Sequence, residues 1–183
     1  MTKAEIIDDF AIELDAYPWI PYEPVGQIIV DECLAQGEGH LFVSTGAALL
    51  QKESGFKNLF GCDHGLTPNN GRAAPFCQCK VTRGRVNRLL ESGLRNGIGT
   101  SQLTATELVM QAESEGGVEF PRYQIRVGFR TLLGHILALD DFQAGAAAYN
   151  AGRGNWRSVY DTYGADMVRL QHEWYLRFKG EIT

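Results

Sequence analysis

The sequence of 183 residues predicts a mainly α-helical fold arranged around one central buried helix. Two observations lead to this prediction. Apolar residues recur at helical spacing in several segments, and most of these segments carry residues that favour a helix start or a helix end. The clearest stripe follows Pro121, a residue suited to the first turn of a helix, and Gly128 within it predicts close helix packing. The stripe consists of Ile125, Phe129, Leu132, Leu133, Ile136 and Leu137.

Residues 1–38 are expected to form an N-terminal helical extension. Thr2 and Glu5 make a capping box ahead of apolar residues at helical spacing, three prolines then interrupt the chain, and a second amphipathic segment begins at Val25. Residues 39–183 are expected to form the main domain. The two parts together should make one compact unit.

Residues 47–56 read as a short apolar helix that ends in one carboxylate. Ser44 or Thr45 can cap its start, and Gly55 suits the left-handed residue that closes a helix. Glu53 is therefore expected at the C-terminal end, where the helix dipole and apolar neighbours raise the pKa of a carboxyl group. A general acid that works near neutral pH needs such a pKa. The alternative is a solvated glutamate in an ordinary last turn.

A long irregular segment, rich in glycine, proline and asparagine, follows Phe56. Loops of this length inside a compact domain are usually functional or cross-linked. Thr82 then begins a predicted helix that Gly93 ends, and Thr104 with Glu107 makes a capping box for the next helix.

Two more helices complete the predicted fold. Asp140 or Asp141 caps the first, whose residues 144–148 are all alanine or glycine and allow close approach of its neighbours. The last helix carries an amphipathic stripe from Met167 to Phe178.

Bulk properties argue against two classes of function. The net charge of −5 gives no reason to expect a nucleic-acid partner, and the longest apolar runs are too short for membrane insertion. The acidic N-terminus lacks the basic start and apolar centre of a signal peptide. Charge is unevenly distributed, because acids dominate before Gly39 and most arginines follow Val81.

Four short motifs occur in order along the chain. They are Glu53-Ser54-Gly55-Phe56, Gly99-Thr100-Ser101-Gln102-Leu103, Tyr123-Gln124-Ile125-Arg126-Val127-Gly128 and Ala148-Tyr149-Asn150-Ala151-Gly152-Arg153-Gly154. In this order they resemble the motifs of the lysozyme-like superfamily of soluble lytic transglycosylases and goose-type lysozymes. The segment from Val81 to Thr104 looks most similar to the muralytic domains of actinobacteriophage endolysins.

The resemblance implies a lysozyme-like helical domain in which the long loop after the catalytic helix borders a sugar-binding cleft. It implies that Glu53 is the catalytic acid and that Tyr149 points toward it. Alternatives remain open for two residues, since Gln102 can serve only as a turn residue and Tyr149 only as a buried aromatic. The predicted substrate-binding residues are Gln102, Tyr149, Asn150, Ser54 and Thr104.

A second carboxylate is harder to assign. The goose-type pattern carries aspartates where this chain has Gly93 and Thr104. Asp63 or Glu91 could substitute, and Asp63 is the better candidate for a second catalytic residue, although it can also be a turn residue that caps a local amide. Without a second carboxylate, the resemblance implies that Glu53 first donates its proton and then acts as a base toward the muramic 6-hydroxyl, which yields a 1,6-anhydro sugar.

The implied function is cleavage of the β-1,4 bond between MurNAc and GlcNAc in peptidoglycan, in a phage endolysin that acts in host lysis. Such a protein, lacking a signal peptide, would stay in the host cytoplasm before release and then act at the cell wall. The anionic wall could meet the arginine-rich half, although a solvated arginine face is the simpler interpretation. Two alternatives are a lytic transglycosylase in a virion- or secretion-associated setting and a non-catalytic glycan-binding module. A binding module would not need the acid Glu53.

The cysteines suggest a possible metal site in the long loop. Cys62-x-His64 and Cys77-x-Cys79 supply four soft ligands that suit a structural zinc ion, with spacing tighter than usual. Free thiols and a disulfide between Cys62 and Cys77 are the alternatives. A zinc ion there would stabilise the loop without taking part in the reaction, so catalysis is expected to need no cofactor.

Overall fold

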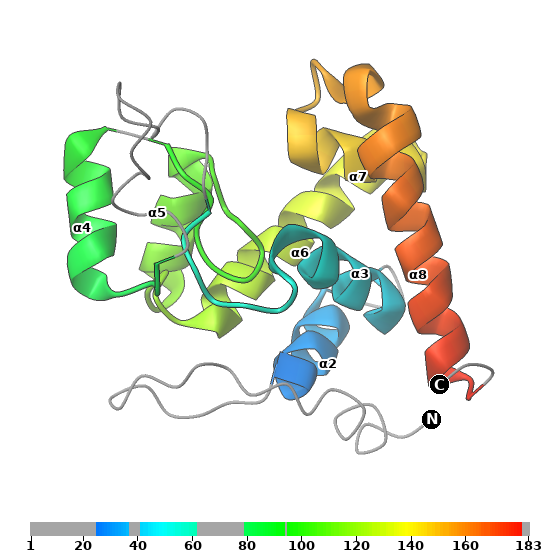
Figure 1. The fold of residues 1–183 in the computed structure, drawn as a ribbon, viewed down its shortest axis with the longest axis horizontal. Helices are drawn as coiled ribbons and strands as arrows, with labels where there is room; N and C mark the ends of the chain where they lie inside the picture. Colours follow the sequence, from blue (N-terminus) through cyan, green and yellow to red (C-terminus); the bar gives the residue numbers. More distant parts are fainter. Residues whose placement is uncertain (1–24, 37–40, 62–78, 94, 181–183) are drawn as a thin grey trace.

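The computed structural model describes residues 25–36, 41–61, 79–93 and 95–180, and every structural statement below concerns these ranges. Over them the protein is mainly α-helical, as predicted, and its β-structure is limited to isolated bridges (Figure 1). The helices are α2 (Val25–Ala35), α3 (Val43–Ser54), α4 (Arg83–Ser92), α5 (Thr106–Glu115), α6 (Pro121–Leu139), α7 (Phe142–Ala151) and α8 (Ala165–Phe178). A 3-10 turn at Trp156–Val159 and a π-helical turn at Tyr160–Gly164 join α7 to α8.

Helix α6 lies between two groups of helices, with α4 and α5 on one side and α3, α7 and α8 on the other (Figure 1). Its side chains enter both hydrophobic cores: Ile125 and Phe129 pack in one core and Val127 in the other. The predicted central buried helix is therefore confirmed. The apolar stripe is shorter than predicted, because Leu137 is 63% exposed where the last turn of α6 passes beyond the core.

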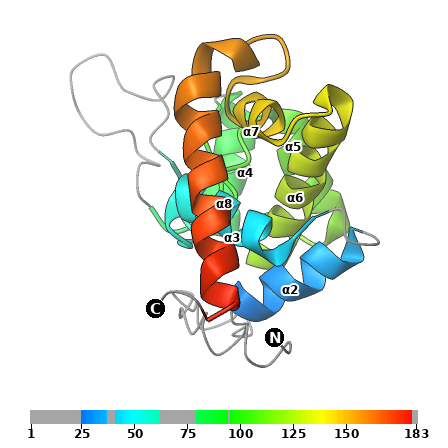
Figure 2. The ribbon, with the colours of Figure 1, turned by 90° about the vertical axis from the view of Figure 1, so that its right-hand side faces the viewer.

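The first core joins buried residues of α2, α3, α6 and α8, and Figure 2 shows α8 running alongside α3 with α2 crossing one end. The second core joins α4 and α5 to the turns around Phe60, Ile98 and Leu103. Gly128 of α6 lies at a close approach, since an added Cβ would come within 2.6 Å of the Ser101 side chain. The close packing predicted at this glycine is confirmed.

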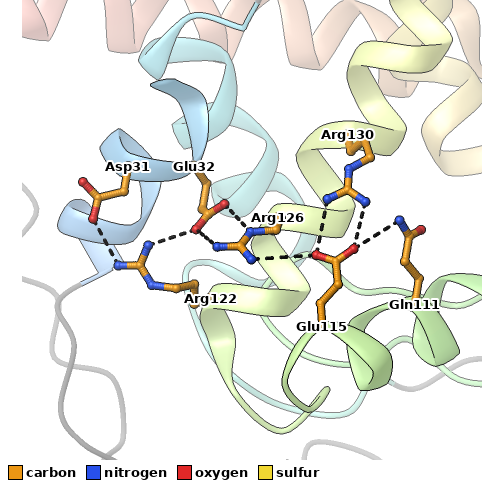
Figure 3. A network of polar contacts seen from close by, with 7 residues as sticks. All are labelled: Asp31, Glu32, Gln111, Glu115, Arg122, Arg126 and Arg130. Carbon is orange, nitrogen blue, oxygen red and sulfur yellow. Dashed lines mark hydrogen bonds and ion pairs between the residues drawn. The ribbon is translucent and has the colours of Figure 1, made fainter. Parts of the chain in front are cut away.

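Helix α2 is attached to α6 by charged side chains (Figure 3). Glu32, only 1% exposed, pairs with Arg122 at 2.9 Å and with Arg126 at 2.7 Å, and Asp31 pairs with Arg122 at 3.1 Å. Arg126 also approaches Glu115 of α5. Residues 25–35 of the predicted extension thus share core and ion pairs with the main domain, whereas the capping box predicted for residues 2–5 lies outside the described residues.

Several predicted helix ends are confirmed. The Thr82 side chain accepts a hydrogen bond from the Arg85 amide, and Asp141 caps α7 through the Ala144 amide. Gly55 and Gly93 both adopt the left-handed conformation that ends a helix.

Two predicted helix starts are wrong. Helix α3 begins after Phe42, and Ser44 and Thr45 lie buried inside its first turn, where the Ser44 hydroxyl accepts a hydrogen bond from Gln171 of α8. Helix α5 begins after Ala105 without a side-chain cap. The Thr104 hydroxyl, which was predicted to cap this helix, instead donates to the main-chain oxygen of Gln102. Within the described residues, no helix is both long and apolar enough to cross a membrane.

Candidate active site

A pocket of about 390 Å³ lies where the end of α3, the turn at residues 102–104, and helices α5, α6 and α7 meet. It draws together five of the six described residues predicted for the site, although they come from three distant motifs. The sixth, Ser54, does not line it. The lining residues are Glu53, Gln102, Leu103, Thr104, Leu108, Thr131, Tyr149 and Asn150.

Glu53 reaches the pocket because α3 ends directly after it. The apolar residues of α3, from Ala47 to Leu50, are fully buried and fix the helix in the first core. Gly55 then reverses the chain at φ 59°, and Phe56 packs edge-on against Trp174 with ring centroids 5.9 Å apart. These contacts hold the helix end in place and leave the Glu53 side chain half-buried at the pocket wall.

Tyr163 is a site residue that the sequence did not indicate. Its hydroxyl donates a hydrogen bond to Oε1 of Glu53 from the π-helical turn at Tyr160–Gly164. Lys52 lies over the Tyr163 ring, 5.3 Å from its centroid, and forms an ion pair with Asp166 at 2.5 Å. Short π-helical segments often occur at functional sites, but they break the 3.6-residue period on which helix prediction depends.

The state of this hydroxyl follows from its surroundings. Burial, and then the nearby charge of Glu53, raise the pKa of Tyr163 well above the ordinary value for tyrosine. The phenol therefore keeps its proton at neutral pH and acts as the donor to the carboxyl group. The bond fixes how that carboxyl group is oriented in the pocket.

Tyr149 lies close to Glu53 but donates its proton elsewhere. Its hydroxyl bonds to the main-chain oxygen of Ser101 at 2.7 Å, which ties α7 to the turn opposite. Burial, followed by the charge of Glu53, raises the pKa of Tyr149 well above its usual value. Tyr149 thus lines the pocket close enough to Glu53 for its charge to act on the hydroxyl, and the hydrogen bond of that hydroxyl connects two walls of the pocket.

Gln102 occupies a left-handed position, with φ 50°. Its amide nitrogen donates to the main-chain oxygens of Leu59 at 3.0 Å and Gly99 at 2.6 Å. An added Cβ at Gly61 or Gly97 would come within 2.4 Å of the Gln102 side-chain oxygen, so a larger residue at either position would displace the Gln102 side chain. This geometry fits the alternative interpretation, in which Gln102 shapes the turn that forms the pocket wall.

Gln124 of α6 holds the same turn from beneath, and it is fully buried. Its side-chain oxygen accepts from the Thr100 amide at 2.8 Å, and its nitrogen donates to Asn58 at 2.9 Å and to the Val118 oxygen at 2.6 Å. The Ser101 hydroxyl in turn donates a hydrogen bond to the main-chain oxygen of Gln124 at 2.7 Å. The sequence signal for Gln124 was its place in the third motif, directly before the first residue of the apolar stripe.

The other predicted substrate-binding residues differ in exposure. The Ser54 hydroxyl lies 2.7 Å from the Thr100 main-chain oxygen, so it ties the end of α3 to the turn rather than facing the pocket. Thr104 is exposed, and its hydroxyl donates a hydrogen bond to the main-chain oxygen of Gln102 at 3.2 Å. Asn150 is exposed at the end of α7 and contributes an amide to the pocket.

Glu53 is the one carboxylate among the described residues that line the pocket. Glu91, the weaker candidate for a second carboxylate, is exposed at the end of α4 and does not line it. Asp63, the preferred candidate, lies outside the described residues. So do three of the four predicted zinc ligands, which are Cys62, His64 and Cys77.

Cys79, the fourth predicted ligand, is half-buried. The described part of the chain holds no group of three or more histidine, cysteine, aspartate and glutamate side chains that could bind a metal ion. No protein-family model, no curated protein and no solved structure matches the chain. A function is therefore argued from the pocket and from the motifs that line it.

Proposed function

We propose that this protein is a peptidoglycan glycosidase with a lysozyme-like fold that cleaves the β-1,4 bond between MurNAc and GlcNAc. The observation that carries the proposal is the half-buried carboxyl group of Glu53, held by Tyr163 in a pocket whose other described lining groups are hydroxyl, amide and apolar. A volume of about 390 Å³ lies in the range of small-ligand sites. The setting proposed from the motif resemblance is a phage endolysin that acts in host lysis.

In this mechanism Glu53 donates a proton to the glycosidic oxygen as the bond breaks, because the sugar leaving group needs protonation. Leu103 and Leu108 line the pocket near the acid, and apolar neighbours favour the protonated carboxyl group that a general acid needs. The Tyr163 hydrogen bond then stabilises the carboxylate that forms after proton transfer. Orientation and charge stabilisation thus come from one hydroxyl group.

A lytic transglycosylase is the second candidate, and one observation favours it. Glu53 is the single carboxylate among the described lining residues, so the same group can act as the base toward the 6-hydroxyl of the muramic residue. Hydrolysis instead requires a group that positions water, and Asp63 is the candidate for that role. A virion- or secretion-associated setting would use the same chemistry.

Mass spectrometry of products from purified peptidoglycan separates these possibilities. Muropeptides with reducing ends indicate hydrolysis, 1,6-anhydro ends indicate transglycosylation, and the absence of products would favour a non-catalytic glycan-binding module. Glu53→Gln should lower the rate of product formation by several orders of magnitude, because the variant can act neither as the acid nor as the base.

The chain offers a matched control for this substitution. Glu91 stands in the same tripeptide, Glu-Ser-Gly, at the end of α4, and a left-handed glycine follows there as well. Because Glu91 is exposed and lies outside the pocket, Glu91→Gln should leave the products unchanged. Near-normal cleavage by Glu53→Gln would refute the assignment of the acid.

A further inference from the structure

The segment from Cys79 to Ile98, which contains α4, is strongly basic in an acidic protein. It carries five basic residues and one acidic residue, for a net charge of +4, whereas the whole chain has a net charge of −5. Its arginines fall into two groups. Arg83 is neutralised by Glu113 and by Glu119, and hydrogen bonding to Glu113 is the largest of the effects that raise its pKa.

The second group, which we call the basic face, consists of Arg85, Arg88 and Arg95. Among the described residues, no carboxylate lies within ion-pair distance of any of the three, whereas five other arginines pair with at least one carboxylate each. Arg85 is half-buried and donates a hydrogen bond to the Lys80 main-chain oxygen at 2.8 Å, while Arg88 and Arg95 are exposed. The five paired arginines are Arg83, Arg122, Arg126, Arg130 and Arg169.

The packing of α4 explains why Arg88 is exposed and Arg85 only half-buried. Val86 and Leu89 are the buried residues of the helix, so Arg85 and Arg88 border that apolar stripe, one turn apart along the axis. Like charges placed this close repel one another and reduce the stability of the folded chain. An anionic partner removes that cost, and guanidinium groups bind carboxylates through paired hydrogen bonds.

The basic face belongs to the same rigid unit as one wall of the pocket. Val86 and Leu89 share the second core with Ile98 and Leu103, and Ile98 forms a bridge with Leu103, which lines the pocket. Arg95 lies three residues before that bridge. Figure 1 shows α4 on the outer side of this group of elements, on the opposite side of the molecule from α8.

We propose that Arg85, Arg88 and Arg95 form a docking surface for the carboxylates of the peptide stems that peptidoglycan carries along its glycan strands. The identity of this partner rests on the proposed function, since the stems belong to the polymer cleaved in the pocket. The charge complementarity is local. A protein with a net negative charge is repelled by a polyanion, and a positive patch turns one defined face toward it.

Binding to insoluble peptidoglycan tests this surface. The background is the full chain with Glu53→Gln, so that the polymer stays intact during sedimentation. Replacing Arg85, Arg88 and Arg95 together by glutamine should weaken binding about tenfold at low salt, as expected for three exposed ion pairs, and should flatten the dependence of binding on salt concentration. The control replaces Arg169, Arg177 and Lys179 of the α8 region by glutamine, which makes the same change in net charge and should leave binding unchanged.

Three further measurements keep the result unambiguous. Replacing the three arginines by lysine keeps the charge and should retain most of the binding, which separates loss of charge from loss of fold. Removing the peptide stems from the glycan strands should weaken binding of the protein that keeps its three arginines. Its affinity for the stripped strands should then be no higher than the affinity of the glutamine variant for intact peptidoglycan. Double-stranded DNA should compete no better than a soluble polycarboxylate of equal charge; stronger competition at equal salt would point to a nucleic-acid partner and overturn the proposal.

Failure of this inference differs from failure of the proposed function. If the two glutamine triples bind equally well while the unsubstituted chain still cleaves peptidoglycan, the docking surface is overturned and the glycosidase stands. If the unsubstituted chain neither cleaves nor binds peptidoglycan, both are overturned.

Discussion

Removing the hydroxyl of Tyr163 should move the pH range of activity upward. Tyr163→Phe deletes the donor to Oε1 of Glu53 and leaves the ring in place beneath Lys52. A hydrogen bond to a charged group is worth roughly 1.5–3 kcal/mol, and one pKa unit corresponds to about 1.4 kcal/mol. For a half-buried pair we take the lower end, so the pKa of Glu53 should rise by about one unit.

The sign of the kinetic effect follows from the role of the acid. The proposed mechanism requires the protonated carboxyl group of Glu53, so a raised pKa should shift the alkaline limb of the pH profile of kcat/KM upward by about one unit. Loss of orientation acts in the other direction and should lower kcat by about tenfold to a hundredfold at every pH. The ratio of wild-type to variant activity should therefore be largest at acidic pH and shrink toward alkaline pH.

Two assays measure these effects independently. The rate at which a peptidoglycan suspension clears, followed between about pH 4 and pH 9, reports the limb, and carboxyl ¹³C NMR of glutamate-labelled protein reports the pKa of Glu53 without any substrate. Glu53→Gln identifies the resonance. Tyr175→Phe, at an exposed tyrosine of α8, is the matched control and should change neither measurement. An alkaline limb that stays in place or moves downward would contradict the assigned hydrogen bond.

Three other predictions concern stability and the pocket wall. Glu32→Gln should cost about 3 kcal/mol in urea unfolding, because two arginines lose a buried partner, whereas Asp31→Asn, in a more exposed pair, should cost less than about 1 kcal/mol. Gly99→Ala should lower the melting temperature and should slow the clearing of peptidoglycan by more than tenfold. The φ of 79° at this position is strained for alanine, and the added Cβ would lie 1.9 Å from the Gln124 side chain. Wild-type values for this variant would contradict the turn geometry. The protein should lose stability as pH rises above about 10, because Tyr149 and Tyr163 have raised pKa values in the folded chain and ionise more readily in the unfolded chain. Circular dichroism melts of the double phenylalanine variant should show a weaker pH dependence, with the remainder due to groups such as Cys33 and Tyr160, whose pKa values are also raised.

The helix ends show which local features a sequence can reveal. Thr82 and Asp141 cap their helices as predicted, since each side chain bonds an amide three residues away and needs nothing else. Ser44 also carries a side-chain oxygen suited to capping, but that oxygen accepts a hydrogen bond from Gln171, a residue far along the chain. A hydroxyl group that has a tertiary partner cannot be recognised from local sequence.

The residues of the candidate site also divide into those that a short motif reveals and those that depend on contacts far along the chain. Glu53 and Asn150 could be selected from short motifs, because each motif contains its own helix end and turn. Tyr163 could not, since it meets the acid across 110 positions of sequence and stands on a π-helical turn where helical periodicity fails. The hydrogen-bond partner of Tyr149 could not be selected either, because a motif gives the residue but not the acceptor of its hydroxyl group.

The pocket is lined by residues attached to both cores, and among the described helices α6 is the one that belongs to both. Glu53 is fixed to the first core through α3, and Gln102 is fixed to the second through its turn. The hydrogen bond from Tyr149 to Ser101 crosses between them beside Gly128, where no side chain separates α6 from either residue. A larger residue at position 128 would push the two walls apart without touching the acid. A glycine in the central helix therefore lets the two walls of the pocket approach each other, and the proposed cleavage depends on that packing as well as on Glu53.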